Sequence, residues 1–152
     1  MDRRTVEEFI RSNKLGWRLI GLNKVVRSVK QAAEALGVPE SNIIKTIIAI
    51  DNSRTYACII PGDRKLDLDK LSRLVGGSPR IAKPREVLER TGYKVGGVPP
   101  IALPEDVIVI MDERVLKMEK AIGGGGDEYS LLEFTPRDLL KIRNVLVADI
   151  SH

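Results

Sequence analysis

The clearest pattern along the chain is a run of apolar, mostly β-branched residues that one cation interrupts. Residues 42–50 read NIIKTIIAI, a polar turn follows at 51–54, and a second apolar run spans 55–60. β-Branched residues favour strands, and a short polar turn between two such runs is typical of a hairpin. We therefore predict a β-hairpin in the core.

Helices are indicated by apolar residues at helical spacing and by capping residues at the ends. Ser28 and Asp67 are good N-caps, prolines suit the first turn of two later helices, and glycines follow three of the segments. The predicted helices span residues 5–14, 28–37, 67–76, 84–92 and 136–142.

The remaining segments predict strands and loops. Strands are expected at 17–22, 107–111, 129–134 and 145–150, residues 115–122 fit a strand or a helix, and 93–100 is a loop by composition. Five or six strands mixed with about five helices indicate an α+β fold, with a mixed sheet curved towards a barrel and surrounded by helices. A length of 152 residues suits a single domain over 1–152.

Single residues exclude several kinds of chemistry. Cys58 is the one cysteine and His152 the one histidine, at the last position. A Ser-His-Asp triad, a Cys-His dyad and the common zinc sites each need an ordered imidazole or several thiolates. We therefore expect no metal and no cofactor. The apolar runs are shorter than the ~18 residues of a membrane span, and Met1–Arg4 is not an apolar signal core, so we expect a soluble cytoplasmic protein.

Positive charge is concentrated in one part of the chain. The formal net charge is +4, and residues 64–94 hold nine basic and four acidic side chains. Such an excess suits a phosphate backbone, although solvated helices also carry lysine and arginine. We expect Arg80, Lys83 and Arg85 to contact nucleic acid.

Lys45 is the most informative candidate for chemistry. Strand alternation places it with Ile43, Ile47 and Ala49 on one face, so an ammonium group lies in an otherwise apolar row. It is either an edge-strand lysine that reaches solvent or a cation at the floor of a pocket, where it attracts a phosphate, carboxylate or carbonyl. Burial would lower its pKa.

Two glycine segments are the next candidates. The loop Gly96–Pro100 could fix backbone N–H groups as donors to an oxyanion, or it is an ordinary turn. Residues 123–126 are all glycine and lack the lysine of a P-loop, so they form either a mobile hairpin loop or a pocket wall. Cys58 lies among apolar strand residues and is interpreted as a buried thiol rather than a nucleophile.

Four motifs in this order resemble the YbaK and prolyl-tRNA synthetase-associated editing-domain family. They are SVKQAAEALGV, NIIKTIIA, GYKVGGVPPIAL and GGGGDEYSLLEFTPRDLL, which together span about residues 28–142. The resemblance implies a free-standing, metal-independent deacylase of mischarged aminoacyl-tRNA with a small amino acid such as Cys or Ala on tRNA-Pro. It implies tRNA as the partner and allows prolyl-tRNA synthetase as another, with no role for DNA or a membrane.

The resemblance also carries roles to individual residues. Lys45 matches the family's functional lysine, Gly97, Val98 and Pro100 match its substrate loop, and Gly124 and Gly125 match its later glycine-rich turn. No role is carried to Asp127 or Glu128, because the residues around them depart from the family pattern.

The implied mechanism has Lys45 engage the 3′-terminal nucleotide or phosphate while the N–H groups of the Gly97–Val98 loop stabilise the oxyanion. Water, a substrate thiol or a ribose hydroxyl remain alternative nucleophiles. A tRNA- or RNA-binding module without catalysis, and a hydrolase of small acyl esters, are the alternative functions.

Overall fold

The computed structural model describes all 152 residues. Its α-helices are α1 (Arg3–Ser12), α2 (Val29–Leu36), α3 (Leu68–Val75), α4 (Pro84–Thr91), α5 (Glu113–Leu116) and α6 (Pro136–Ile142), with a 3-10 turn at Glu40–Asn42. Its strands are β1 (Arg18–Gly21), β2 (Ile44–Asp51), β3 (Arg54–Pro61), β4 (Arg80–Ile81), β5 (Ile108–Asp112), β6 (Ala121–Gly124), β7 (Ser130–Phe134) and β8 (Val145–Ala148). No helix combines the length and the apolar content that crossing a bilayer requires.

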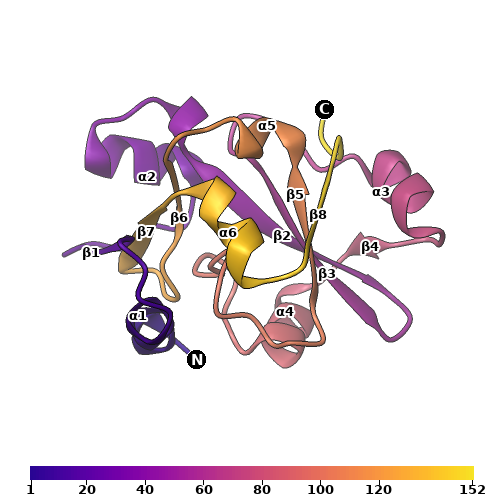
Figure 1. Cartoon of the computed structure of the whole chain (residues 1–152), viewed down its shortest axis with the longest axis horizontal. Coiled ribbons are helices and arrows are strands. Elements are labelled where there is room, and N and C mark those ends of the chain that lie inside the picture. The colour runs from indigo at the N-terminus through magenta and orange to yellow at the C-terminus, as the bar shows by residue number, and fades with distance from the viewer.

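The strands divide between two sheets. A mixed five-stranded sheet has the order β4-β2-β3-β5-β8, and an antiparallel three-stranded sheet has the order β1-β7-β6. Figure 1 shows the smaller sheet on the left, with α1 below it and α2 above it, and the larger sheet to its right. The α+β class with a mixed sheet is confirmed, whereas the expected barrel-like closure is not seen. The sheets meet at a single bridge between Ile43 and Ile122, and the outer edge of β2 lies open between that bridge and β4.

Local signals placed the helices and the hairpin well. Ser28 Oγ accepts the Gln31 N–H at 3.1 Å and Gly37 ends α2 with a φ of 66°, as a helix C-cap glycine does. The hairpin of β2 and β3 turns at Asn52 and Ser53, inside the predicted turn.

The strand count was wrong, because there are eight strands rather than five or six. The segment 115–122 divides into the end of α5 and the start of β6, and Gly123 and Gly124 belong to a strand rather than a hairpin loop. The two-residue strand β4 was not predicted, since only its pairing with Ala49 and Ile50 of β2 defines it.

β2 is packed on both faces. Ile44, Ile48 and Ile50 belong to a core of 20 buried residues that also contains side chains from α1, α4, α5 and α6. Ala49 lies in a second cluster with Leu71 of α3, on the opposite face. A strand covered on both faces reads as a continuous apolar run, which explains why Lys45 interrupts that run so visibly.

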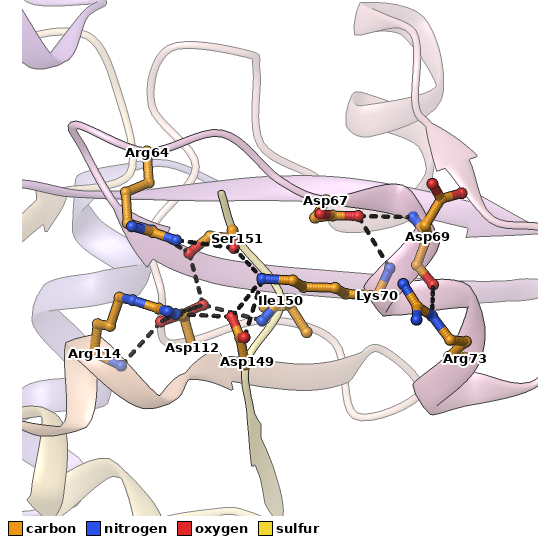
Figure 2. A network of polar contacts seen from close by, with 10 residues as sticks. All are labelled: Arg64, Asp67, Asp69, Lys70, Arg73, Asp112, Arg114, Asp149, Ile150 and Ser151. Atoms are coloured by element: carbon orange, nitrogen blue, oxygen red, sulfur yellow. Dashed lines mark hydrogen bonds and ion pairs between the residues drawn. The ribbon is translucent and has the colours of Figure 1, made fainter.

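A network of charged groups fastens the chain after β8 (Figure 2). The fully buried carboxylate of Asp112 accepts the Ile150 N–H at 3.1 Å and the Ser151 hydroxyl at 2.8 Å. Asp149 bridges Arg114 at 2.8 Å and Lys70 of α3 at 3.0 Å. These contacts attach the segment after β8 to both α3 and α5.

Candidate active site

A cavity of about 540 Å³ opens along the outer edge of β2. Its walls come from the start of α2, from β2 itself, from the segment between β4 and α4, from the loop at 95–98 and from β6, and most lining residues are hydrophobic. The size is in the range of sites that hold small ligands. The cavity therefore occupies the space left between β4 and β6 where β2 has no neighbouring strand.

The register of β2 fixes which backbone groups face this cavity. Ile43 C=O accepts the Gly62 N–H at 2.7 Å on the β3 side, whereas Ile48 C=O accepts the Ala82 N–H at 2.9 Å on the outer side. Because strand residues alternate in this respect, the N–H and C=O of Thr46 also face outward. Thr46 Oγ1 is buried without a hydrogen-bond partner. Thr46 thus brings unpaired polar groups to a mostly apolar wall, a feature that we did not predict.

Lys45 lines the cavity, and its ammonium group makes no ion pair or hydrogen bond within the chain. Burial lowers the pKa of its ammonium group, the positive charge of Lys65 lowers it further, and Asp63 partly opposes both. β2 has an open edge at this position, which also agrees with the alternative that Lys45 is an edge-strand lysine. That alternative does not explain why an apolar cavity lies beside the ammonium group.

The loop after Tyr93 supplies one available donor rather than two. The Gly97 N–H donates to Lys94 C=O at 3.0 Å, whereas the Val98 N–H has no acceptor in the chain. Val98 also lines the cavity, and Gly97 is buried behind it. Of the two predicted oxyanion donors, only the Val98 N–H is free to donate to a ligand in this structure.

Backbone packing explains the glycines of this region. A Cβ on Gly97 would lie 2.7 Å from Asp127 Cα, and a Cβ on Gly124 would collide with the Val98 carbonyl group. Gly124 lines the cavity. Gly125 and Pro100 are buried outside the lining, where Gly125 N–H bonds Ser130 C=O at 3.1 Å. These two residues support the wall rather than form it.

Both carboxylates of the β6–β7 turn are held by arginines. Asp127 pairs with Arg3 at 2.9 Å, and Glu128 pairs with Arg27 at 2.7 Å. Burial raises the pKa of Asp127, but hydrogen bonds from Arg3, Tyr129 and Ser130 outweigh it, so the net pKa is lowered. Asp127 is therefore an ionised structural partner in this structure.

The basic side chains near the cavity differ in whether a carboxylate already pairs with them. Arg27 and Lys30, which sequence reasoning missed, line the cavity, although Arg27 is paired. Their only signal in the sequence was their position on either side of the Ser28 cap. Arg80 pairs with Glu86 at 2.7 Å, Arg85 lies 3.7 Å from Glu89, and Lys83 is exposed without a carboxylate partner.

No group of three or more histidine, cysteine or carboxylate side chains is arranged to hold a metal ion. Cys58 is fully buried, and burial raises the pKa of its thiol to about 12. A protonated, inaccessible thiol does not act as a nucleophile, as expected from its apolar surroundings.

Comparison with known proteins identifies the family. Residues 23–142 match the aminoacyl-tRNA editing domain, and the chain belongs to this family. Membership makes it an aminoacyl-tRNA deacylase, an ester hydrolase, and confirms the resemblance seen in the sequence motifs.

Three similar proteins illustrate the relationship. The crystal structure of the hypothetical protein APE2540 has a TM-score of 0.93 and 46% identity, with 97% of this chain and 99% of that chain covered. A candidate trans-editing enzyme for prolyl tRNA synthetase has a TM-score of 0.89 and 32% identity, with 99% and 96% covered. The candidate Cys-tRNA(Pro)/Cys-tRNA(Cys) deacylase EbsC of Enterococcus faecalis is 27% identical over 126 residues, which are 82% of this chain and 77% of EbsC.

Proposed function

We propose that this chain acts in trans and hydrolyses a small amino acid, alanine or cysteine, from mischarged tRNA-Pro. The observation that carries the proposal is the unpaired Lys45 ammonium group in a mostly apolar cavity, which is also lined by Val98, a residue whose N–H has no acceptor in the chain. The cation attracts the phosphate end of the substrate, and apolar walls accept a small side chain. The names of EbsC and of the trans-editing relative support tRNA-Pro as the carrier.

In the proposed mechanism Lys45 holds the 3′-terminal nucleotide or its phosphate, and the Val98 N–H donates to the developing oxyanion. Water attacks the ester carbonyl carbon, the bond from that carbon to the ribose oxygen breaks, and the ribose oxygen takes a proton. The products are the free amino acid and uncharged tRNA. The thiol of a cysteinyl substrate and the neighbouring ribose hydroxyl are alternative nucleophiles.

The proposed substrate also indicates which residues contact the tRNA, which enzyme is the partner and where the reaction takes place. Arg80, Lys83 and Arg85 contact the tRNA backbone in this proposal, and Pro100, Gly124 and Gly125 shape the substrate site. Prolyl-tRNA synthetase, which would make the mischarged ester, is the functional partner, and the reaction takes place in the cytoplasm. The whole chain acts as one catalytic domain.

The test is deacylation of tRNA-Pro charged with alanine, cysteine or proline under single-turnover conditions. We expect loss of alanine or cysteine and retention of proline. Binding of uncharged tRNA without any turnover would indicate an RNA-binding module instead. Equal hydrolysis of aminoacyl esters of small alcohols would indicate a hydrolase of small acyl esters.

A further inference from the structure

Helix α1 begins with an arginine that reaches the turn between β6 and β7. Arg3 Nε donates to Asp127 Oδ2 at 2.9 Å, and Arg3 Nη2 donates to Asp127 Oδ1 at 3.3 Å. Asp127 Oδ1 also accepts the Tyr129 N–H at 2.9 Å and the Ser130 hydroxyl at 3.0 Å. A two-point contact of this kind fixes direction as well as distance. Arg3 thus orients a carboxylate that the turn itself already holds.

The same turn contacts the substrate loop through its backbone. Gly126 N–H donates to Gly97 C=O at 2.9 Å. A Cβ on Gly97 would lie 2.7 Å from Asp127 Cα, and a Cβ on Gly126 would lie 2.7 Å from the Asp2 carbonyl carbon. Three backbone segments are therefore in direct contact, from the start of α1 through the turn to the loop. Val98, with the free amide, is the next residue after Gly97.

The strength of the ion pair does not by itself explain this arrangement. The side chains of Arg3 and Asp127 keep 36% and 29% of their exposure, and ion pairs that remain so exposed contribute little to folding stability. Their contact instead joins the N-terminal helix to the turn that packs against the cavity wall. Arg3 lies outside residues 23–142, the part of the chain that matches the editing domain.

We infer that Arg3 and Asp127 form a latch that positions the Val98 N–H for the reaction, so that Arg3 is a positioning residue supplied by the N-terminal helix. The catalytic consequence rests on the proposed function, while the order of the loop does not. Without the latch the turn is free to move, and the loop that depends on it then samples positions in which the Val98 N–H misses the oxyanion.

The experiment compares Arg3→Ala, Arg3→Lys and Asp127→Asn with the parent and with Arg11→Ala. Arg11 is the control because it lies on the same helix and pairs only with Glu8. Three quantities are measured: kcat and KM for deacylation, the melting temperature, and hydrogen exchange at the amides of Gly126 and Val98. Exchange reports the latch even if the chain has a different substrate.

We expect Arg3→Ala to lower kcat by about ten- to a hundred-fold, because small misplacements of reacting groups have effects of this size. KM and the melting temperature should stay close to the parent values, exchange at Gly126 should become faster, and Arg3→Lys should restore part of kcat. Asp127→Asn keeps the shape of the side chain and should reproduce the effect of Arg3→Ala, which provides a second test if Arg3→Ala does not fold.

Unchanged exchange and unchanged kcat in both latch variants would overturn the inference. So would a fall in kcat that Arg11→Ala shares, or one that only follows a lower melting temperature. Faster exchange in the latch variants of a chain that deacylates none of the charged tRNAs would keep the latch and reject the proposed function.

Discussion

The Lys45 ammonium group has a positive neighbour in Lys65 and a negative neighbour in Asp63, but it forms no ion pair in the chain. A lysine in a protein interior is usually paired, because an unpaired buried charge is costly. Lys45 avoids most of that cost by remaining partly exposed in the cavity. Its charge is therefore available to an anionic ligand, which is the property that the proposed reaction uses.

Replacement of this residue tests the role directly. We expect Lys45→Ala to lower single-turnover deacylation at least ~100-fold, as removal of a group that orients or stabilises charge in a transition state does. The melting temperature should change little, because the Lys45 side chain makes no hydrogen bond or ion pair and the backbone pairing of β2 is kept in the variant. An unchanged rate in a folded variant would remove Lys45 from the mechanism.

The protonation of Lys45 gives a second prediction. Its pKa is lowered below the ordinary lysine value of about 10.4, first by burial and then by Lys65. The mechanism needs the charged form, so turnover, corrected for spontaneous ester hydrolysis, should fall as the pH rises through that pKa.

Neighbouring charges allow the assignment to be checked in both directions. Lys65→Ala removes a positive neighbour, raises the pKa of Lys45, and should move the falling limb to higher pH. Asp63→Asn removes a negative neighbour and should move it to lower pH. If both variants keep the parent profile, the limb belongs to another group.

At the scale of elements, the sequence predicted those helices and turns whose ends are determined by contacts between neighbouring residues. Ser28 and Gly37 define α2 by hydrogen bonds and backbone angles within a few residues, so the sequence contains the information. β4 depends on its pairing with β2, which is distant in the sequence, and the glycines of β6 are explained by contacts with residues that are also distant in the sequence. Gly123 and Gly124 looked like a loop because glycine is rare in strands, yet the space beside Ile44 and Val98 requires them in β6.

The same distinction applies to the site. Alternation along β2 predicted Lys45 as an isolated cation, because neighbours on one strand determine its face. The open edge at Thr46 depends on how separate elements pack. The ion pairs of Asp127 and Glu128 likewise join turns to α1 and to the segment before α2, which a single sequence does not reveal.

The segment after β8 provides a prediction about acid stability. Hydrogen bonds from Arg114 and Lys70 lower the pKa of Asp149 to about 2. Its folded pKa is below the ordinary value of about 3.9, so the stabilisation is present above about pH 4 and is lost as the pH falls through 2.

We therefore expect Asp149→Asn to lower the melting temperature by a few degrees at neutral pH, since partly exposed ion pairs contribute modestly. The difference from the parent should vanish near pH 2. Asp106→Asn is the matched control, because Asp106 is an exposed aspartate without an ion pair. A constant difference at all pH values would mean that the charge of Asp149 does not stabilise the fold.

At the scale of the whole molecule, the basic segment adjoins the cavity. Ile81 and Ala82 line it, and they stand between Arg80 and Lys83 in the sequence. A tRNA backbone that crosses this segment would therefore lead its 3′ end towards Lys45. Of the three expected contacts, Lys83 is the one whose side chain forms no ion pair, so we expect it to contribute most.

The salt dependence of tRNA affinity distinguishes side chains that contact phosphate from charged side chains that are only exposed to water on a helix. Replacing Arg80, Lys83 and Arg85 with alanine should weaken tRNA binding and leave single-turnover chemistry at saturating tRNA nearly unchanged. The slope of log affinity against log salt should become shallower by roughly 0.7 to 0.9 for each phosphate that the protein no longer neutralises. Lys83→Ala alone should produce most of the change, and Arg11→Ala should produce none. An identical slope in the triple variant and the parent would place the tRNA elsewhere, with Lys30 at the start of α2 as the next residue to replace.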